Sequence, residues 1–143
     1  MSTANINDVL MLHFPELGDD RGRLVVIEGG DGISMQVPFV VKRVFYAYGS
    51  DATAVRGKHA NRNSEFCLIN LCGQSKVKVT DQLGNKKVFV LDKPYIGLYL
   101  PAMIWKDMYD FSHNSILLVL SSEYYDESEY IHNFDEYICR NQR

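Results

Sequence analysis

Hydrophobic and polar positions along the chain recur in short runs that are typical of β-strands. Residues 76–80 alternate strictly between polar positions and valine, and the chain then turns at 81–85 and returns at 87–91. This pattern predicts a hairpin with one face in water. Runs rich in β-branched and aromatic residues predict further strands at 24–28, 39–48, 66–71, 95–100, 105–111 and 116–120.

Turn-forming residues bound these runs and set the fold class. Pro38 opens one strand without lying inside it, and Pro, Gly, Asn or Ser flank the later strands. About eight strands in this length favour an all-β jelly-roll barrel. Residues 123–143 are acidic and aromatic, and they predict a short helical or irregular tail that packs outside the barrel.

Length, composition and charge narrow the class of protein. The chain has 143 residues, no internal repeat and no linker composition, so we expect one domain over 1–143. No run approaches the roughly 20 apolar residues of a membrane span. The N-terminus lacks a secretion signal pattern and the three cysteines form no C-x-x-C pair, which favours the cytoplasm. A net charge of −3 argues against a general nucleic-acid binder.

The most informative segment is residues 56–61, with the sequence Arg-Gly-Lys-His-Ala-Asn, followed by Glu65. On a strand that enters a small barrel, the even spacing of His59, Asn61 and Glu65 places them on one face, which we expect to point inward. The imidazole of His59 is then a candidate proton carrier, because its ordinary pKa is about 6.5. The alternative is a core histidine that is satisfied by hydrogen bonds.

A metal site is the first function to test, because this segment looks like half of a cupin site. Cupin barrels commonly hold a divalent ion with two histidines and a glutamate from one motif and a further histidine from a later one. Here Asn61 stands at a ligand position, and residues 97–106 contain no histidine. We therefore expect no metal. His13, His113 and His132 fall near predicted turns or termini and are interpreted as surface residues.

Basic and aromatic residues accompany His59 on segments that would line the same barrel. Arginine side chains match phosphate oxygens in pairs of hydrogen bonds, and flat rings can stack on a base, so the mixture favours a nucleotide-bearing small molecule. For single residues the alternatives are a solvated strand face for the cations and core or dimer packing for the rings. Glu65 could orient His59 or pair with an arginine, and Asp126, Glu127 and Glu129 are interpreted as a solvated face. The residues expected at this anion pocket are Arg43, Arg56, Lys58, Arg62, Lys106, Tyr46, Tyr48, Tyr99 and Trp105.

Three stretches resemble the bacterial sugar 3,4-ketoisomerases of the WxcM-like cupin family. They are residues 41–46, residues 56–61, and a long block that includes 97–105, 110–112, 117–122 and 124–127. The resemblance extends over nearly the whole chain. It implies a jelly roll, a homodimer that exchanges N-terminal strands, and a reaction that needs neither a metal nor another cofactor.

The resemblance also implies a substrate, a dTDP-linked 4-keto-6-deoxy-D-glucose, whose ketone moves from C4 to C3 through an enediolate. His59 would take the C3 proton and return it at C4, and Tyr46 or Asn61 would stabilise the charged oxygen. Arg43 and Arg56 are expected to bind phosphate or sugar. Arg21 and Lys106 are expected to approach the sugar and to influence the face of protonation.

Two departures from the family keep other functions open. Asn61 stands where the family often has a second histidine, and Phe45 stands where it often has a tyrosine. The alternatives are a non-catalytic nucleotide-sugar binding cupin, a 3,5-epimerase-like enzyme and a purely structural cupin. For the isomerase, the family implies a role in making a deoxy or amino sugar of the lipopolysaccharide O-antigen, with an aminotransferase acting on the product.

Overall fold

The computed structural model describes residues 4–30 and 35–138. Their secondary structure is almost entirely β. The elements are η1 (Ile6–Asp8), β1 (Leu10–His13), β2 (Glu16–Asp19), β3 (Gly22–Val25), β4 (Arg43–Tyr48), β5 (Arg56–Asn61), β6 (Phe66–Cys72), β7 (Ser75–Thr80), β8 (Lys86–Leu91), β9 (Ile96–Leu100), β10 (Trp105–Tyr109), β11 (Ile116–Ser121), η2 (Glu127–Glu129), β12 (Tyr130–Ile131) and α1 (Phe134–Tyr137).

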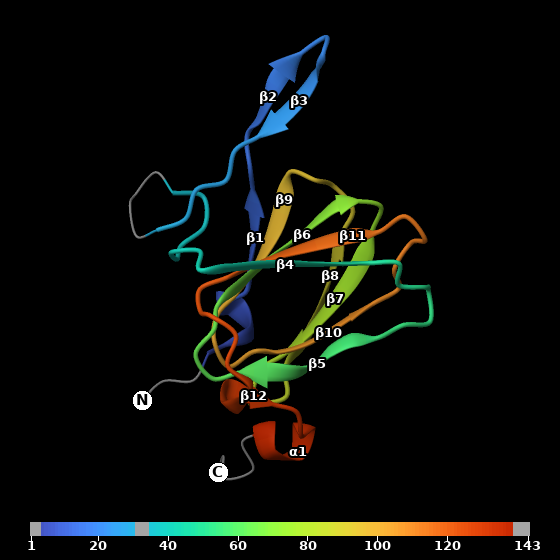
Figure 1. The fold of residues 1–143 in the computed structure, drawn as a ribbon. Coiled ribbons are helices and arrows are strands. Elements are labelled where there is room, and N and C mark those ends of the chain that lie inside the picture. Colours follow the sequence, from blue (N-terminus) through green and yellow to red (C-terminus); the bar gives the residue numbers. More distant parts are fainter. Residues whose placement is uncertain (1–3, 31–34, 139–143) are drawn as a thin grey trace.

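Two antiparallel five-stranded sheets pack face to face (Figure 1). The first has the order β1-β9-β6-β11-β4, and the second has the order β12-β5-β10-β7-β8. Strands far apart in the sequence are therefore neighbours, as in a jelly roll, because β6 lies between β9 and β11 while β10 lies between β5 and β7. The prediction of an all-β jelly-roll barrel is confirmed.

The main core fills the space between the two sheets. Phe66 and Leu68 of β6 and Val119 of β11 meet Val77 and Val79 of β7 there, and all five side chains are buried. The intervening β6 residues Cys67 and Ile69 are buried as well, on the outer face of the first sheet. This strand is covered on both faces, so its sequence is a continuous apolar run rather than an alternating one.

The hairpin expected around residues 81–85 is confirmed as β7 and β8, which pair from Ser75 with Leu91 to Thr80 with Lys86. Asp81 organises the turn, because its carboxylate accepts hydrogen bonds from the backbone nitrogens of Leu83 and Asn85 at 3.1 and 2.9 Å. β7 carries buried valines that alternate with half-buried lysines. One face of the hairpin thus lies on the core and the other faces solvent.

Other boundaries differ from the expectation. The strand expected at 24–28 ends at Val25, and the strand expected at 39–48 begins only at Arg43. Phe39 instead packs with Phe14 and Val37 over the outer face of the first sheet, so an apolar run that was expected to be a strand forms a covering loop. The β2–β3 hairpin, which alternation did not reveal, stands away from the two sheets (Figure 1).

The C-terminal segment begins as an edge strand of the second sheet and ends in a short helix, which matches the helical tail expected on the outside of the barrel. β12 pairs with the end of β5, and Tyr137 of α1 packs on Trp105 at a ring-centroid distance of 5.6 Å. Ile131 and Tyr137 are buried together with Ala60 and Trp105. Among the described residues, no helix is long and apolar enough to cross a bilayer.

Candidate active site

A bulge in β5 prepares the position of His59. Gly57 and Lys58 both have left-handed backbones, with φ of 85° and 57°, and the pairing of β5 with β10 shifts register opposite them. Glycine is required at 57, because an added Cβ would lie 2.9 Å from the carbonyl oxygen of Lys106 and 3.0 Å from Cε of Met108. The bulge re-aims the strand just before His59.

The imidazole of His59 is held in a defined protonation form. Its Nδ1 lies 3.0 Å from the carbonyl oxygen of Gly57. A carbonyl can only accept a hydrogen bond, so Nδ1 carries the proton and Nε2 keeps a free lone pair. The neutral ring is therefore prepared to act as a base through Nε2. Its pKa is lowered to about 4, first by burial and next by the charge of Lys106.

Two adjoining cavities meet at this ring. An outer chamber of about 320 Å³ is lined by residues that include Arg56, Tyr46 and Val55. An inner recess of about 80 Å³ reaches Lys106, Phe66 and Tyr130. The lining residues that the two cavities share are His59, Phe45, Met108 and Val119. His59 thus lies where the chamber narrows into the recess.

Lys106 is a buried cation in the wall of the recess. Its strand neighbours across the sheet are His59 on β5 and the core residue Val79 on β7, which places its side chain on the inner face. Nζ donates a hydrogen bond to Oδ1 of Asn61 at 3.1 Å and lies 4.6 Å from the ring centre of Phe66. Burial lowers the pKa of Lys106 to about 7.

Asn61 is buried beside Lys106, with only 1% of its surface exposed. Its Oδ1 accepts from the lysine, and its Nδ2, which has no partner at ordinary hydrogen-bond geometry among the described residues, interacts with the carboxylate of Glu129 and helps to lower the pKa of that group. Asn61 therefore links Lys106 to Glu129 inside the protein. It lines neither cavity, and Glu65, which was expected on the same strand face, lies beyond the end of β5.

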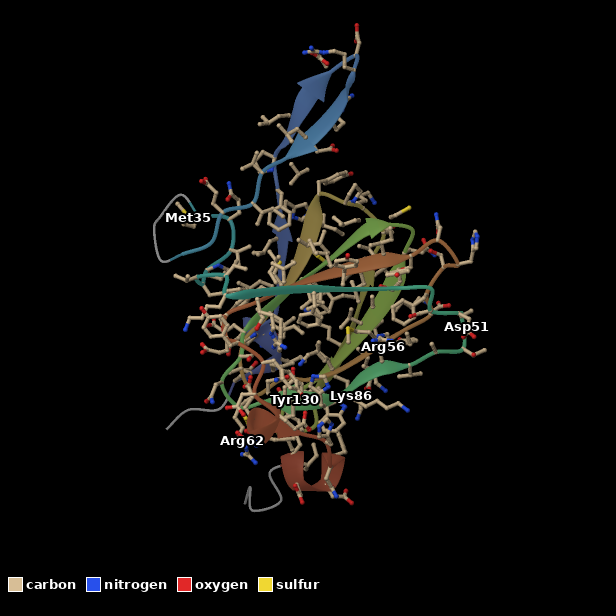
Figure 2. All side chains as sticks on the ribbon, in the orientation of Figure 1. Met35, Asp51, Arg56, Arg62, Lys86 and Tyr130 are labelled. Atoms are coloured by element: carbon tan, nitrogen blue, oxygen red, sulfur yellow. The ribbon has the colours of Figure 1, made fainter. Side chains whose placement is uncertain are left out.

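The C-terminal segment completes the recess and supplies residues that sequence reasoning missed. The ring centre of Tyr130 on β12 lies 4.7 Å from that of His59 (Figure 2), and the ring centre of His132 lies 5.9 Å from that of His59. His132 also pairs with Glu127 at 2.9 Å. His132 is exposed as expected, but it lies beside the candidate base. The one feature of the sequence that could have indicated a role of this segment in the site is its aromatic content.

Glu129 anchors this segment, which corrects its interpretation as part of a solvated face. It is 3% exposed, and Oε1 accepts hydrogen bonds from the backbone nitrogens of Asn63 and Ser64, each at 2.8 Å. Oε2 accepts a further one from the Ser64 hydroxyl. Burial alone raises the pKa of this carboxyl, but the hydrogen bonds outweigh it and the pKa is lowered.

The cations and tyrosine expected at the pocket lie at different depths. Arg56 and Tyr46 line the outer chamber, where Tyr46 is 62% exposed and stacks on Tyr48 at 6.2 Å. Arg43 lies 5.0 Å above the ring of Phe45, and its guanidinium donates to the carbonyl of Glu123 and the hydroxyl of Ser121. Lys58 is exposed on β5 and lines neither cavity.

Four further residues that were expected at the pocket line neither cavity of this chain: Arg21, Glu65, Tyr99 and Trp105. The Tyr99 hydroxyl donates to Glu65 at 2.5 Å, and the ring of Tyr99 packs near Phe39 on the outer face of the first sheet. Trp105 lies under α1, on the opposite side of β10 from Lys106. Loops and α1 cover the outer faces of the sheets, so a buried aromatic side chain on a strand can point outward as well as into the barrel. Arg21 pairs with Asp19 on the projecting hairpin.

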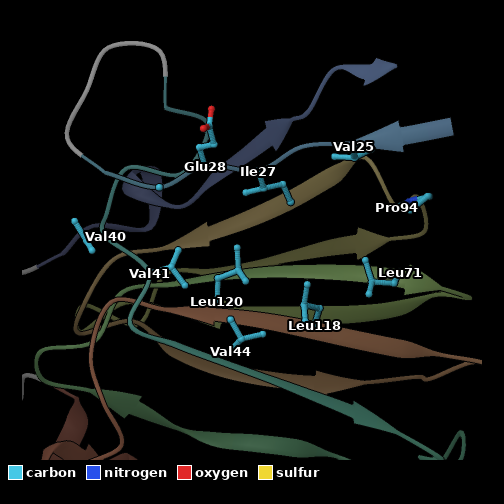
Figure 3. Close-up of a pocket in the computed structure, with 11 residues that line it drawn as sticks. Val25, Ile27, Glu28, Val40, Val41, Val44, Leu71, Pro94, Leu118 and Leu120 are labelled. Atoms are coloured by element: carbon cyan, nitrogen blue, oxygen red, sulfur yellow. The ribbon is translucent and has the colours of Figure 1, made fainter. Parts of the chain in front are cut away.

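A separate apolar groove of about 660 Å³ lies on the outer face of the first sheet (Figure 3). Val44 of β4 and Leu118 and Leu120 of β11 point into it. Because side chains alternate along a strand, these residues face away from the recess that Phe45 and Val119 line. The groove and the candidate active site are therefore on opposite faces of one sheet.

Comparison with known proteins decides the family. The family model described as "WxcM-like, C-terminal" matches residues 7–142. The chain belongs to the WxcM-like family. It is 38% identical over 128 residues, which are 89% of this chain and 88% of the relative, to a TDP-4-oxo-6-deoxy-alpha-D-glucose-3,4-oxoisomerase of Aneurinibacillus thermoaerophilus. The identification made from residues 41–46, 56–61 and the later block is confirmed.

Two solved 3,4-ketoisomerase structures superpose closely on the chain. A 3,4-ketoisomerase mutant from Thermoanaerobacterium thermosaccharolyticum, in complex with TDP-4-keto-6-deoxyglucose, is 36% identical with a TM-score of 0.87, covering 94% of each chain. A TDP-fucose-3,4-ketoisomerase from Campylobacter jejuni is 38% identical with a TM-score of 0.83, covering 91% of this chain and 93% of its own. A dTDP-4-dehydrorhamnose 3,5-epimerase from Bacillus anthracis is only 17% identical, with a TM-score of 0.73 and coverage of 89% and 79%, so it shares the fold alone.

The side chains that line the two cavities indicate whether the site could hold a metal ion. Within the described residues, no three or more histidine, cysteine, aspartate or glutamate side chains are grouped as metal ligands. The residues that line the chamber and the recess include one imidazole and no carboxylate. A divalent ion prefers several nitrogen, sulfur or oxygen ligands, so this lining suits proton transfer better than metal binding.

Proposed function

We propose that this protein is a sugar-nucleotide isomerase that moves the ketone of dTDP-4-keto-6-deoxy-D-glucose from C4 to C3 by proton transfer, without a metal or another cofactor. The observation that carries the proposal is His59, which lines both cavities and whose Nδ1 is held by the carbonyl of Gly57, so that Nε2 is the basic nitrogen. Relatives at 36–38% identity bear the names of 3,4-ketoisomerases, which supports the same reaction class here.

The reaction begins at the carbon next to the ketone. The C4 carbonyl acidifies the C3 hydrogen, and Nε2 of His59 takes that proton. The electrons form a C3–C4 double bond and leave negative charge on the C4 oxygen. The hydroxyl proton on the C3 oxygen passes to the C4 oxygen, a proton adds to C4, and the C3 oxygen becomes the ketone.

The recess offers a donor to the charged oxygen. The cation of Lys106 lines it, where hydrogen bonds to developing charge are strongest, and Asn61 holds the lysine amine at 3.1 Å from outside the lining. Asn61 replaces a family histidine with a group that cannot act as a base. This supports an enzyme in which Asn61 positions Lys106 and His59 transfers the proton.

The outer chamber is assigned to the nucleotide. Arg56 lies in its lining and carries the planar donors that suit a diphosphate, and Tyr46 adds an exposed ring. Arg43 stacks on Phe45 and so supports the wall at the junction. We keep Arg56 as the principal phosphate contact and place Tyr46 at the nucleotide rather than at the reacting carbons.

The direct test is incubation with dTDP-4-keto-6-deoxyglucose, followed by nuclear magnetic resonance of the sugar. The proposal expects a 3-keto sugar, and the spectrum also gives the configuration at C4. A changed configuration at C3 or C5 with the ketone still at C4 would indicate an epimerase. Thermal stabilisation by thymidine diphosphate without any conversion would indicate a binding protein.

We also propose a homodimer in which the β2–β3 hairpin packs on a second copy. The hairpin stands away from its own barrel and exposes Leu17 and Leu24 at 53% and 57%, and the outer groove is apolar (Figures 1 and 3). Exchange of this hairpin would carry Arg21 toward the partner's site. Light scattering should report a dimer, and a Leu17→Asp, Leu24→Asp variant should be monomeric, whereas Leu83→Asp in an exposed turn should not. A monomeric parent protein contradicts the proposal.

The chemistry of the product suggests the setting. A 3-keto sugar is a substrate for a pyridoxal phosphate-dependent aminotransferase, so we propose that such an enzyme consumes it in the cytoplasm. The resulting amino sugar would enter the O-antigen of lipopolysaccharide. Conversion of the nuclear magnetic resonance product to a 3-amino sugar by an added aminotransferase tests the chemical part of this sequence.

A further inference from the structure

Among the residues that the structure describes, Lys106 is the one buried cation that lines the recess beside His59, yet single-base chemistry gives it no part in moving protons. It is 4% exposed, and within residues 4–30 and 35–138 no carboxylate forms an ion pair with it. The charge of Glu129 acts on the ammonium without direct contact, and burial still outweighs it. A buried ammonium without a directly paired carboxylate is costly, and a structural lysine would ordinarily extend its amine to solvent. The position therefore calls for a function.

The geometry points to Lys106 as the acid that protonates C4, so that this isomerase uses two groups instead of one imidazole. The inference rests on the proposed function. His59 and Lys106 are direct neighbours across β5 and β10, and both line the inner recess. Asn61 holds Nζ at 3.1 Å, which leaves two of the three ammonium hydrogens free for a ligand.

The proton balance closes with these two groups. His59 takes the C3 proton and becomes an imidazolium, while Lys106 gives one proton to C4 and becomes a neutral amine. The proton that passes between the two sugar oxygens stays on the substrate. Transfer of the proton on His59 to Lys106 then restores both groups for the next cycle, with no oxidant, reductant or additional reactant.

The electrostatics of the recess favour each transfer. The ionisable groups around Nζ are His59 on β5, Glu129 on η2 and Tyr130 on β12. Burial lowers the pKa of Lys106 to about 7, close to the working range of a general acid. Burial is the largest cause that lowers the pKa of His59, and it acts whether Lys106 is charged or neutral, so it favours the return of a proton from imidazolium to amine.

Substitutions at 106 separate removal of the C3 proton from delivery at C4. In deuterated solvent, Lys106→Met should still exchange the C3 hydrogen of the substrate for deuterium through His59. In this variant the rate of ketone migration should fall by a factor at least tenfold larger than the factor by which the rate of C3 exchange falls. Lys106→Arg keeps the charge, but its guanidinium does not release a proton near neutral pH, so it should show the same separation. Lys78→Met, on the solvent side of β7, is the matched control and should change neither rate.

Other outcomes overturn the inference. Equal losses of exchange and migration in Lys106→Met mean that the lysine stabilises the enediolate and does not protonate C4. Restored migration in Lys106→Arg means that its charge alone matters. Absence of both activities in the parent protein overturns the proposed function as well. Stabilisation by thymidine diphosphate confirms that each variant is folded.

A pH profile of the parent protein tests the inference without any substitution. Ketone migration should decline as pH rises through the pKa of Lys106, because the acid loses its proton, while C3 exchange through neutral His59 should not decline. Parallel profiles for the two processes contradict the assignment.

Discussion

Substitution of Lys106 by methionine should make the stability of the fold less dependent on pH. Methionine has a similar length and no charge. In the folded chain burial lowers the pKa of Lys106 from 10.5 to about 7, whereas in the unfolded chain the amine keeps its ordinary value. Between these two values the unfolded chain binds more protons, so the free energy of unfolding of the parent protein rises with pH.

The magnitude follows from the size of the pKa difference. Each unit is worth about 1.4 kcal/mol, so protonation of Lys106 contributes a change of about 3 kcal/mol in the free energy of unfolding between roughly pH 6.5 and 9.5. This is a large share of the ~5–15 kcal/mol that stabilises a typical domain. The methionine variant also leaves Oδ1 of Asn61 without its partner, a cost of about 1–3 kcal/mol that does not depend on pH.

Urea unfolding at the two pH values measures this effect. The single tryptophan, Trp105, is buried against Tyr137 and reports unfolding by its fluorescence. The stability difference between the parent and Lys106→Met should change by about 3 kcal/mol between the two pH values, in favour of the variant at the lower one. Lys78→Met controls for the loss of a lysine elsewhere. A difference that is the same at both pH values refutes the buried-cation reasoning.

Four further predictions concern the elements around the site. Gly57→Ala should cost about 1–2 kcal/mol of stability and lower kcat, because alanine is strained at the bulge; unchanged urea unfolding contradicts this. Glu129→Gln should cost about 2–3 kcal/mol and lower activity, because a charged acceptor of backbone hydrogen bonds is lost; Glu136→Gln, on exposed α1, is the control, and equal stability of the two variants argues against the anchor. Arg56→Ala should raise KM for the nucleotide sugar with little change in kcat, and the reverse pattern in steady-state kinetics contradicts a phosphate contact. C3 exchange should persist in mild acid and fall only as pH approaches the lowered pKa of His59, because protonation removes the base; loss of exchange already near pH 6.5 argues against it.

The sequence pattern was sufficient for the strands with a strong local signal. Strict alternation predicted the β7–β8 hairpin, and a continuous apolar run predicted the strand β6, which is buried on both faces. His59 and Asn61 were predicted to share one face because of their even spacing on a strand, whereas Glu65, predicted on the same face, lies beyond the end of β5 and accepts a hydrogen bond from Tyr99. These are local rules, and each depends only on residues that are near in the chain.

Other features depend on contacts that are distant in the chain. Glu129 is buried only because its carboxylate meets backbone nitrogens some 65 positions earlier, and nothing in its acidic surroundings indicates this. Tyr99 and Trp105 were expected in the pocket. Loops and α1 cover the outer faces of the sheets, so the apolar sequence around these residues did not reveal which face of the sheet each ring occupies. The placement of Tyr130 beside His59 depends on a strand of two residues.

The central claim is that the imidazole of residue 59 removes the hydrogen from C3 of a bound keto sugar. The most direct measurement follows deuterium incorporation at C3 of dTDP-4-keto-6-deoxyglucose by nuclear magnetic resonance, for the parent protein and for His59→Asn. We predict rapid incorporation by the parent protein, and none by the variant even though thymidine diphosphate still stabilises it against heat. Incorporation by His59→Asn at the parent's rate would contradict the account.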